Sequence, residues 1–339
     1  MSRGGVTHVR NAEVRVEIDG LVGRRVSLRH RIGERDGRPL YSDAVGELTA
    51  GGDTVTVHGR RGPVEVLRSA VVAVRAVPPA PPRRASLSAI TRLENLCADA
   101  WPAQVDELLG AWRLRAASGY TGRANSALAV GQPDRPVPAA LDAVRAFAER
   151  TGIGPRVQVP IGSPWDTAVA AEGWVLDAGH EAGAEVTVHV AGLAGLADLP
   201  APGRTGRPSA VEVAARPSAA WWDLAAGGEP GAAQRGVLDP GRDTAFLMVL
   251  GPDGTALGTL RAAVVEDHLH LSVLEVLPAA RRRGLATGLV AAAAAWGRDQ
   301  GARWAVLQVA LHNTGALAFY DRLGFVEHHR YRYLVPPRA

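Results

Sequence analysis

A proline-rich segment near residue 80 divides the chain into two parts with different patterns. VPPAPPRRA, residues 77–85, contains four prolines, which argue against a central strand or a helix and favour a stiff linker. Before it, short runs of alternating β-branched and polar residues, among them TVTVHG and VVAVRAV, are separated by Gly and Asp turns. After it, helical and strand patterns are mixed. We therefore predict a small all-β barrel over residues 1–80 and an α/β region from residue 86 onward.

A weak internal repeat subdivides the second part. RTGIGPRVQV precedes PWDTAVAAEGW, and about 150 residues later DQGARWAVLQV precedes NTGALAFYDRLGF, so that Gln158 corresponds to Gln308 and Gly173 to Gly324. The segment between the copies, residues 192–210, is rich in Gly and Pro, as is typical of a connection. The repeat predicts two related halves, over residues 86–200 and 205–339. Helical patterns in the first half are expected near residues 86–99, 103–109 and 138–150.

Composition excludes several classes of protein. No apolar run approaches the roughly 18 residues that cross a bilayer, and MSRGGVTHVR lacks an apolar signal core, so we expect a cytoplasmic protein without membrane association. The one cysteine, Cys97, forms no internal disulfide and is expected to pack in a helix, while CxxC and HExxH spacings are absent, so no metal is expected. The net charge of +4 comes from scattered arginines without interleaved aromatics, which argues against nucleic-acid binding.

A basic, glycine-containing loop gives the sharpest functional signal. RRRGLA, from Arg281 to Ala286, directly follows a predicted strand and directly precedes a predicted helix. The first amides of a helix lack intrahelical partners and carry partial positive charge, so they bind phosphates well. Gly284 and Ala286 leave room for such a group, and the arginines add charge around it. The loop predicts a diphosphate site, with a solvated basic loop as the alternative.

A second motif follows about thirty residues later, in order and with a predicted strand between. It is VALHNTGALAFYDRLGF, which contains Asn313, Tyr320 and Gly324-Phe325. Together the two segments resemble the GNAT superfamily of N-acetyltransferases, whose members pair an R/QxxGxG/A loop with NxxAxxFYxxxGF. The resemblance implies an α+β GNAT fold with a mixed, mostly antiparallel sheet in tandem halves. It also implies transfer of an acetyl group from acetyl-CoA to an amine by direct attack on the thioester.

The resemblance assigns donor-site roles to matching positions. The strand before the loop would offer backbone groups to the pantetheine arm, at Leu274, Glu275 and Val276. The pyrophosphate would meet the loop amides, at Arg281, Arg282, Arg283, Gly284, Leu285, Ala286 and Thr287. Asn313 would bond the pantetheine besides capping the next helix, and capping alone is the alternative. Tyr320 would protonate the departing thiolate, because a phenol stays protonated at neutral pH; a packing tyrosine is the alternative.

The general base is less clear, because Gln308 stands where some relatives carry a glutamate. Another position that relatives use for the base corresponds to His270, which titrates near neutrality. Strand alternation is expected to put His268, His270 and Ser272 on one face and Glu275 on the other. His270 is the preferred base and Glu275 the second candidate. An exposed strand residue without a catalytic role remains the alternative for both.

The first half resembles a degenerate GNAT half without a phosphate loop. The matching segment, AVGQPDRPVPAAL, contains Pro136 and Pro138 and no RxxGxG, so no second donor site is expected. An Arg-x-Asn-Ser pattern makes Arg123, Asn125 and Ser126 candidates for lining the acceptor pocket, although ordinary turn and strand polarity also explains them.

The acceptor and the partners stay open at this point. The N-terminal barrel looks like an SH3-like module, a class that docks proteins, nucleic acids or a neighbouring domain. The three-part arrangement is similar to an actinobacterial GNAT family, some of whose members are named N-acetylglutamate synthases, so glutamate is a candidate acceptor. Protein lysine and other small amines are alternatives, and a non-catalytic acyl-CoA sensor or scaffold is an alternative of another class. The sequence leaves the oligomeric state open.

Overall fold

The chain folds into two units, Met1–Arg83 and Arg84–Ala339. In the first unit, buried valines and leucines alternate with exposed polar residues along the strands. The computed structural model describes residues 18–59, 62–77, 85–199, 211–238, 241 and 243–337. Residues 78–84 of the predicted linker and 200–210 of the predicted connection lie outside the described residues. Each unit is built on one sheet.

The first unit is a five-stranded antiparallel sheet in the order β4-β3-β2-β1-β5. Its elements are β1 (Arg25–Arg35), β2 (Arg38–Gly51), β3 (Thr54–Gly59), β4 (Gly62–Leu67), the 3-10 turn η1 (Arg68–Ala70) and β5 (Val71–Ala76). The side chains of Val26, Leu28, Leu48 and Val57 are fully buried between the curved strands. The predicted all-β character of this unit is confirmed for the described residues.

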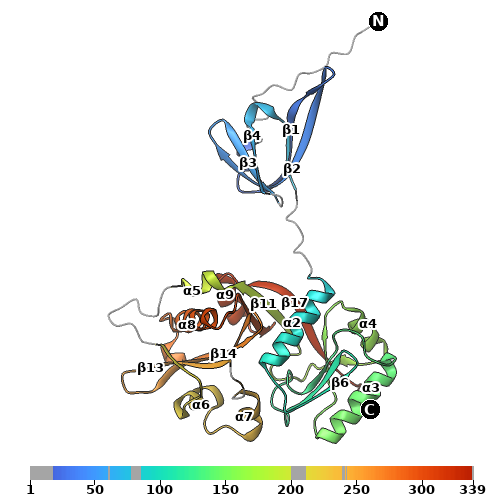
Figure 1. Ribbon diagram of the computed structural model, residues 1–339, viewed down its shortest axis with the longest axis vertical. Coiled ribbons are helices and arrows are strands. Elements are labelled where there is room, and N and C mark those ends of the chain that lie inside the picture. The colour runs from blue at the N-terminus through green and yellow to red at the C-terminus, as the bar shows by residue number, and fades with distance from the viewer. Residues whose placement is uncertain are drawn as a thin grey trace. The chain divides into compact units, whose positions relative to one another are not determined.

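The second unit is one 12-stranded sheet with helices against it (Figure 1). Its first half contributes α2 (Leu87–Ala100), β6 (Val105–Leu109), β7 (Trp112–Ala116), β8 (Ser126–Leu128), α3 (Val137–Thr151), β9 (Val157–Pro160), α4 (Pro164–Ala171), β10 (Val175–Leu176), β11 (Glu185–Gly192) and α5 (Leu193–Ala197). Its second half contributes β12 (Val211–Ala214), α6 (Ala219–Ala226), α7 (Ala232–Leu238), β13 (Thr244–Leu250), β14 (Ala256–Val265), β15 (His268–Val276), η2 (Pro278–Ala280), α8 (Leu285–Asp299), β16 (Trp304–Ala310), α9 (Thr314–Arg322) and β17 (Val326–Val335).

The two halves exchange their last strands. The sheet runs β12-β13-β14-β15-β16-β11-β17-β9-β8-β7-β6, so that β11 of the first half pairs with β16 and β17 of the second half pairs with β9. Each half also contains one parallel pair, β8 with β9 and β15 with β16. The strand order therefore repeats the order of elements that the sequence repeat predicts, and the halves share one sheet.

Helices cover both sides of the second half. On one side, here called the α8 face, α8, α5 and α9 pack on strand residues such as Leu260, Leu271 and Leu307. On the other side, the α2 face, α2, α6 and α7 pack on residues such as Phe246, Met248 and Val306. Because alternate residues of a strand point to opposite faces, each strand of the second half contributes to two cores.

Two local predictions differ from the structure. Residues 103–109, predicted to be helical, include strand β6, which forms a hairpin with β7 around Gly110 (φ 62°). Pairing of Val105 with Ala116 and of Leu109 with Trp112 there outweighs the weak helical preference of the sequence. The short helix α7 was not predicted. The hairpin at Pro252-Asp253-Gly254 is confirmed, with Gly254 at φ 82° between β13 and β14.

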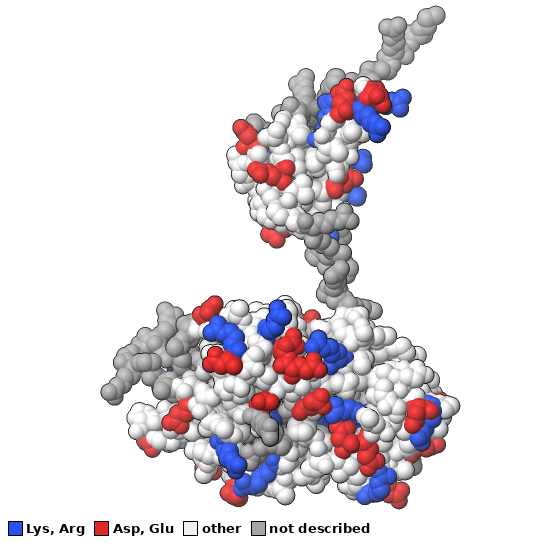
Figure 2. Space-filling view, viewed as in Figure 1, with Lys and Arg blue, Asp and Glu red and all other residues white. Residues whose placement is uncertain are grey.

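Figure 2 shows acidic and basic side chains next to one another on the visible face. Ion pairs among the described residues include Arg29–Asp43, Arg113–Asp99 and Arg330–Glu327. None of the helices in the described ranges has the length and apolar character that would let it cross a bilayer.

Candidate functional site

The parallel strands β15 and β16 separate along their length. Their ladder consists of the pairs His268↔Trp304, Leu269↔Ala305 and His270↔Val306, and within the described residues no pair follows. On its other edge β15 stays paired with β14 as far as Val276. The strands therefore diverge after His270, and residues 271–276 of β15 present an open edge toward β16.

A β-bulge lies in this open part of β15. Val273 adopts φ 51°, and the register between β14 and β15 shifts between Thr259 and Arg261. The left-handed region is unfavourable for a β-branched residue and costs about 1–3 kcal/mol. Strain of this size is tolerated only where the surrounding packing enforces it, and Val273 packs against the core on the α2 face.

The bulge reverses which alternate side chains of β15 point to each face of the sheet. One prediction from the sequence is therefore wrong. Before and after it, the residues that pack on the α8 face are Leu269 and Leu271, then Leu274 and Val276. Glu275 lies between Leu274 and Val276 and opposite Thr259, so its side chain points to the α2 face, where His270 contacts Trp101. The prediction that Glu275 and His270 occupy opposite faces was wrong, because the extra residue at Val273 shifts the period by one.

The loop after β15 leads into a helix start without a side-chain cap. Gly284, the N-cap of α8, has φ 80°, and no side chain bonds the first amides of that helix. The helices α2, α4, α6 and α9 all carry a Ser or Asn cap instead. A Cβ at Gly284 would meet no atom within 4 Å, so the glycine is needed for its backbone angle. The amide end of α8 is thus open for an anion.

A cavity of about 230 Å³ lies at this helix start. Its lining combines the end of β15, the loop and two side chains of α9: Val276, Ala280, Arg281, Arg282, Gly284, Leu285, Ala286, Thr287, Phe319 and Arg322. Arg283 is exposed but does not line it. Arg322 was missed by the sequence reasoning, although it lies inside the NxxAxxFYxxxGF segment, two residues after Tyr320. The side chain of Arg281 donates from Nε to the carbonyl of Val276 at 3.2 Å, which fixes it beside the strand end.

Asn313 and Tyr320 frame the same region from α9. The Oδ1 atom of Asn313 accepts from the amide of Ala316 at 3.1 Å, which is the capping role, and its amide group is exposed. Tyr320 is 8% exposed and packs against Phe319 and Phe325. Burial, and secondarily the negative charge of Glu275, raises the pKa of the Tyr320 phenol. The hydroxyl therefore keeps its proton, and Glu275 lies close enough to influence it.

His270 is buried on the α2 face. Its side chain is 1% exposed, and neither ring nitrogen has a hydrogen-bond partner among the described residues. Burial, followed by the charges of Arg123 and Arg261, lowers its pKa to about 3; Gln308 opposes this only weakly, from outside hydrogen-bond geometry. The ring is neutral at physiological pH and has little affinity for a proton.

Arg123 reaches His270's surroundings from the first half. It donates from Nη1 to Oε1 of Gln308 at 3.0 Å and lies over the ring of Trp101, 4.5 Å from the centroid. Trp101 in turn contacts the ring of His270, with 6.3 Å between centroids. Of the three residues predicted to line an acceptor pocket, Arg123 is the one that lies beside the second half.

Asn125 and Ser126 use their polar atoms within the first half. Asn125 is 2% exposed, accepts from the amides of Ala117 and Gly119, and donates to the carbonyls of Tyr120 and Thr121. The hydroxyl of Ser126 accepts from Arg115 at 3.0 Å. Asn125 thus fixes the 117–121 loop, which precedes Arg123.

The second unit is similar to proteins described as acetyltransferases. The family model described as "Probable histone acetyltransferase Rv0428c C-terminal" matches residues 87–334. The "Probable histone acetyltransferase Rv0428c" of Mycobacterium tuberculosis (strain ATCC 25618 / H37Rv) is 41% identical over 108 residues, which are 32% of this chain and 34% of that protein. The chain therefore matches about a third of the length of this curated relative.

One solved structure shows the shared fold, and a second is reported beside it. The GCN5-related N-acetyltransferase from Kribbella flavida superposes with a TM-score of 0.54 at 19% identity, over 74% of this chain and 96% of that one. A tandem GNAT protein from the clavulanic acid biosynthesis pathway gives a TM-score of 0.47 at 16% identity, over 77% of this chain and 88% of that one. Since the family model matches residues 87–334, well over half of the chain, the chain belongs to the family described as "Probable histone acetyltransferase Rv0428c C-terminal".

Proposed function

We propose that the protein transfers the acetyl group of acetyl-CoA to an amine, in the gap between β15 and β16. The observation that carries the proposal is the open edge of β15 next to the uncapped amide end of α8. An extended amide-containing arm fits the first, and a diphosphate fits the second. Arg281, Arg282 and Arg322 line the cavity at that helix end and supply the charge that a diphosphate needs.

Tyr320 is the proposed acid. Its pKa is raised by burial, so the phenol holds a proton to give to the sulfur as the carbon–sulfur bond breaks. The position of its ring in the apolar packing between Phe319 and Phe325 supports a fixed hydroxyl direction. Asn313, with its exposed amide group at the start of the same helix, is proposed to hold the pantetheine arm.

Glu275 is the proposed proton acceptor, in preference to His270. A base with a pKa of about 3 inside the core takes up a proton poorly, whereas the Glu275 carboxylate is exposed on the open edge of β15. Because of the bulge, both residues belong to the α2 face, from which an amine would approach a thioester bound on the α8 face. Glu275 would accept the ammonium proton, directly or through water, before the nitrogen attacks the carbonyl carbon.

The acceptor is proposed to be a cationic amine such as a lysine side chain, and not glutamate. A cavity of about 390 Å³ adjoins Leu277 at the end of β15 and contains the carboxylates of Asp223 and Asp253. Hydrogen bonds from Thr255 lower the pKa of Asp253, so it is ionised. The arginines on this face are committed elsewhere: Arg123 to Gln308, and Arg261 to the carbonyls of Leu238 and Ala100. The name of the curated relative, a probable histone acetyltransferase, agrees with a lysine acceptor.

A CoA-release assay tests the proposal. Acetyl-CoA is offered with a lysine-containing peptide, spermidine, or glutamate, and free thiol is measured over time. The chain contains no lysine, so acetylation of its own lysine side chains cannot contribute to the signal. We expect turnover with the lysine peptide or spermidine and none with glutamate. A preference for glutamate would overturn the acceptor class, and absence of turnover with every amine would overturn the reaction.

Substitutions of three carboxylates test the proposed base and the proposed acceptor cavity. Glu275→Gln is expected to lower kcat by about 100-fold, the usual contribution of a general base. Asp223→Asn with Asp253→Asn is expected to raise KM for the lysine peptide several-fold and leave KM for acetyl-CoA unchanged. Glu212→Gln removes an exposed carboxylate on edge strand β12 and serves as the control, with unchanged kinetics.

A further inference from the structure

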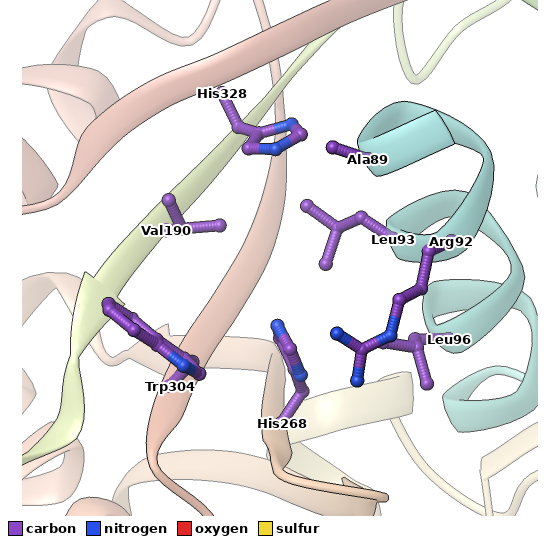
Figure 3. A pocket seen from close by; sticks show the side chains of 8 residues that line it. All are labelled: Ala89, Arg92, Leu93, Leu96, Val190, His268, Trp304 and His328. Carbon is purple, nitrogen blue, oxygen red and sulfur yellow. The ribbon is translucent and has the colours of Figure 1, made fainter. Parts of the chain in front are cut away.

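A third cavity lies at the opposite end of β15 from the proposed donor site. It encloses about 250 Å³ between α2 and the sheet and is lined by Ala89, Arg92, Leu93, Leu96, Val190, His268, Trp304 and His328. His268 begins β15, about 26 Å of strand away from Val276 at the donor cavity. Figure 3 shows His328 and His268 entering this cavity from opposite sides, with α2 side chains facing Trp304 and Val190.

The ring of His328 is the first member of a buried chain of hydrogen bonds. Its Nδ1 atom lies 2.8 Å from Nδ1 of His329, whose Nε2 lies 2.7 Å from Oε1 of Glu94. The other oxygen of Glu94 accepts from Nε2 of Gln158 at 2.6 Å, and Oε1 of Gln158 accepts from Arg115 at 2.8 Å. Glu94, Gln158 and Arg115 are each 2% exposed or less, so the chain is shielded from water.

Charge balance fixes the proton positions in this chain. Arg115 is always charged and donates hydrogen bonds to Ser126 and Gln158, which are neutral, so Glu94 is the carboxylate that compensates it through Gln158. An ionised Glu94 requires a proton on Nε2 of His329, which leaves Nδ1 of that ring as an acceptor. His328, whose pKa is lowered mainly by burial, is neutral and must donate from Nδ1. Its Nε2 atom therefore carries a lone pair on the cavity side.

His268 presents the same arrangement from the opposite wall. Its Nδ1 lies 2.8 Å from Oδ1 of Asp267, so Nδ1 donates to this carboxylate and Nε2 is the ring nitrogen that can offer a lone pair. Arg92, at the rim, is paired with both Glu266 and Asp267. One guanidinium thus faces two carboxylates, which leaves the rim with a net negative charge. Trp304, 47% exposed, forms an aromatic wall.

We propose that this cavity binds a small organic ammonium ion with an apolar body, distinct from the acceptor amine of the proposed reaction. The two Nε2 lone pairs accept hydrogen bonds from the ammonium group, and the face of Trp304 attracts its charge. Leu93, Leu96 and Val190 enclose the apolar part. The volume suits a ligand of fragment size. A carboxylate of the same shape meets two lone pairs and a negative rim, and is rejected.

A binding measurement without acetyl-CoA tests this site apart from catalysis. The full chain is titrated with 2-phenylethylamine and with 3-phenylpropionate, which share an aromatic body and differ in the sign of the head group. We expect the amine to bind at least tenfold more tightly than the carboxylate. Ala89→Phe, which fills the cavity from α2, is expected to abolish amine binding, and Ser88→Phe, on the exposed side of the same helix, to preserve it. Tighter binding of the carboxylate, no binding of the amine at 20 mM (about the weak limit for a fragment), or binding that survives Ala89→Phe would overturn the proposal.

The proton positions give a second test that needs no variant. Long-range ¹H–¹⁵N correlation spectra of histidine rings distinguish a proton on Nδ1 from one on Nε2. At neutral pH we expect His328 to carry its proton on Nδ1 and His329 on Nε2, and Glu94→Gln to change both signals. A proton on Nε2 of His328 in the unaltered protein would turn this ring into a donor and contradict the ammonium site.

Discussion

Arg123 and Gln308 form a hydrogen bond of 3.0 Å although 185 residues separate them in sequence. Gln158, the counterpart of Gln308 in the repeat, also accepts a hydrogen bond from an arginine, Arg115, at 2.8 Å. The first half thus keeps its own arginine–glutamine pair and supplies an arginine to the glutamine of the second half. Together with the exchange of β11 and β17, this contact makes the two halves a single structural unit.

Separated halves are therefore expected not to fold. A fragment of residues 205–339 lacks β11, β9 and β10, so that β16 would lose the partner on one edge and β17 its partners on both edges. We expect this fragment and the 86–200 fragment to be unfolded or aggregated alone by circular dichroism and size exclusion, and to form a soluble complex when produced together. A folded 205–339 fragment that binds acetyl-CoA as tightly as the full chain would contradict the shared unit.

Acid stability should depend on His270. An imidazole in the unfolded chain titrates near 6.5, whereas the folded pKa is lowered to about 3. Between these values the unfolded state binds a proton that the folded state does not, so stability is full above pH 6.5 and falls with pH, by at most about 1.4 kcal/mol per pH unit. His270→Gln should lose less stability than the unaltered protein between pH 7.5 and pH 5 in urea unfolding.

His312→Gln, at an exposed histidine of the same unit, is the matched control and should keep the original pH dependence. The buried or half-buried His180, His189 and His328 also have lowered pKa values, so a slope remains in every variant. The test is the difference between the variants, and equal slopes for His270→Gln and His312→Gln would count against a neutral, buried His270.

Tyr320→Phe should lower kcat by about 100-fold, because the acid that serves the leaving thiolate is lost, with KM for acetyl-CoA changed less than about twofold. The raised pKa of Tyr320 predicts that its ionisation causes no loss of activity up to about pH 10, the ordinary value of a tyrosine. Steady-state kinetics over pH 7–10 give both results. Tyr41→Phe, at an exposed tyrosine of the first unit, is the control. Unchanged kcat in Tyr320→Phe would remove the assignment.

The local features of the candidate site were predictable from the sequence, and the long-range ones were not. The loop at Arg281–Thr287 could be predicted because its residue types indicate both features of the site. A glycine between a strand and a helix indicates the backbone geometry, and the arginines before it supply the charge. The bulge at Val273 could not be predicted from the sequence, because packing and not the preference of valine holds this residue at positive φ. The extra residue of the bulge places Glu275 on the same face as His270.

The exchange of β11 and β17 between the halves could not be predicted from the sequence either. The repeat predicted similar halves, but which half's last strand lies beside β16 is decided by pairing between segments more than a hundred residues apart. β6 was missed for a different reason, because pairing in its local hairpin with β7 outweighs the weak helical preference of its sequence. Arg322 was overlooked because the direction of an exposed residue on α9 depends on how that helix packs beside the loop.

The loop arginines should act on binding and not on chemistry. Arg282→Ala and Arg322→Ala remove cations from the cavity at the start of α8, so each should raise KM for acetyl-CoA by about threefold to tenfold at low salt, with kcat unchanged. The effect should shrink at 0.5 M salt, where exposed charges are screened. Arg298→Ala, at the far end of the same helix, should behave like the unaltered protein. An equal effect of Arg298→Ala would indicate a general charge effect.

The donor site itself is tested most directly by calorimetric titration of acetyl-CoA into the full chain and two glycine variants. Gly284→Val strains the amide end of α8 at φ 80°, and Gly301→Val introduces the same kind of strain just after the other end of the helix, at φ 91°. The account predicts one binding event in the unaltered protein and in Gly301→Val, and at least tenfold weaker binding in Gly284→Val. Absence of binding heat in the unaltered protein up to millimolar acetyl-CoA, or equal affinity in the two variants, would contradict it.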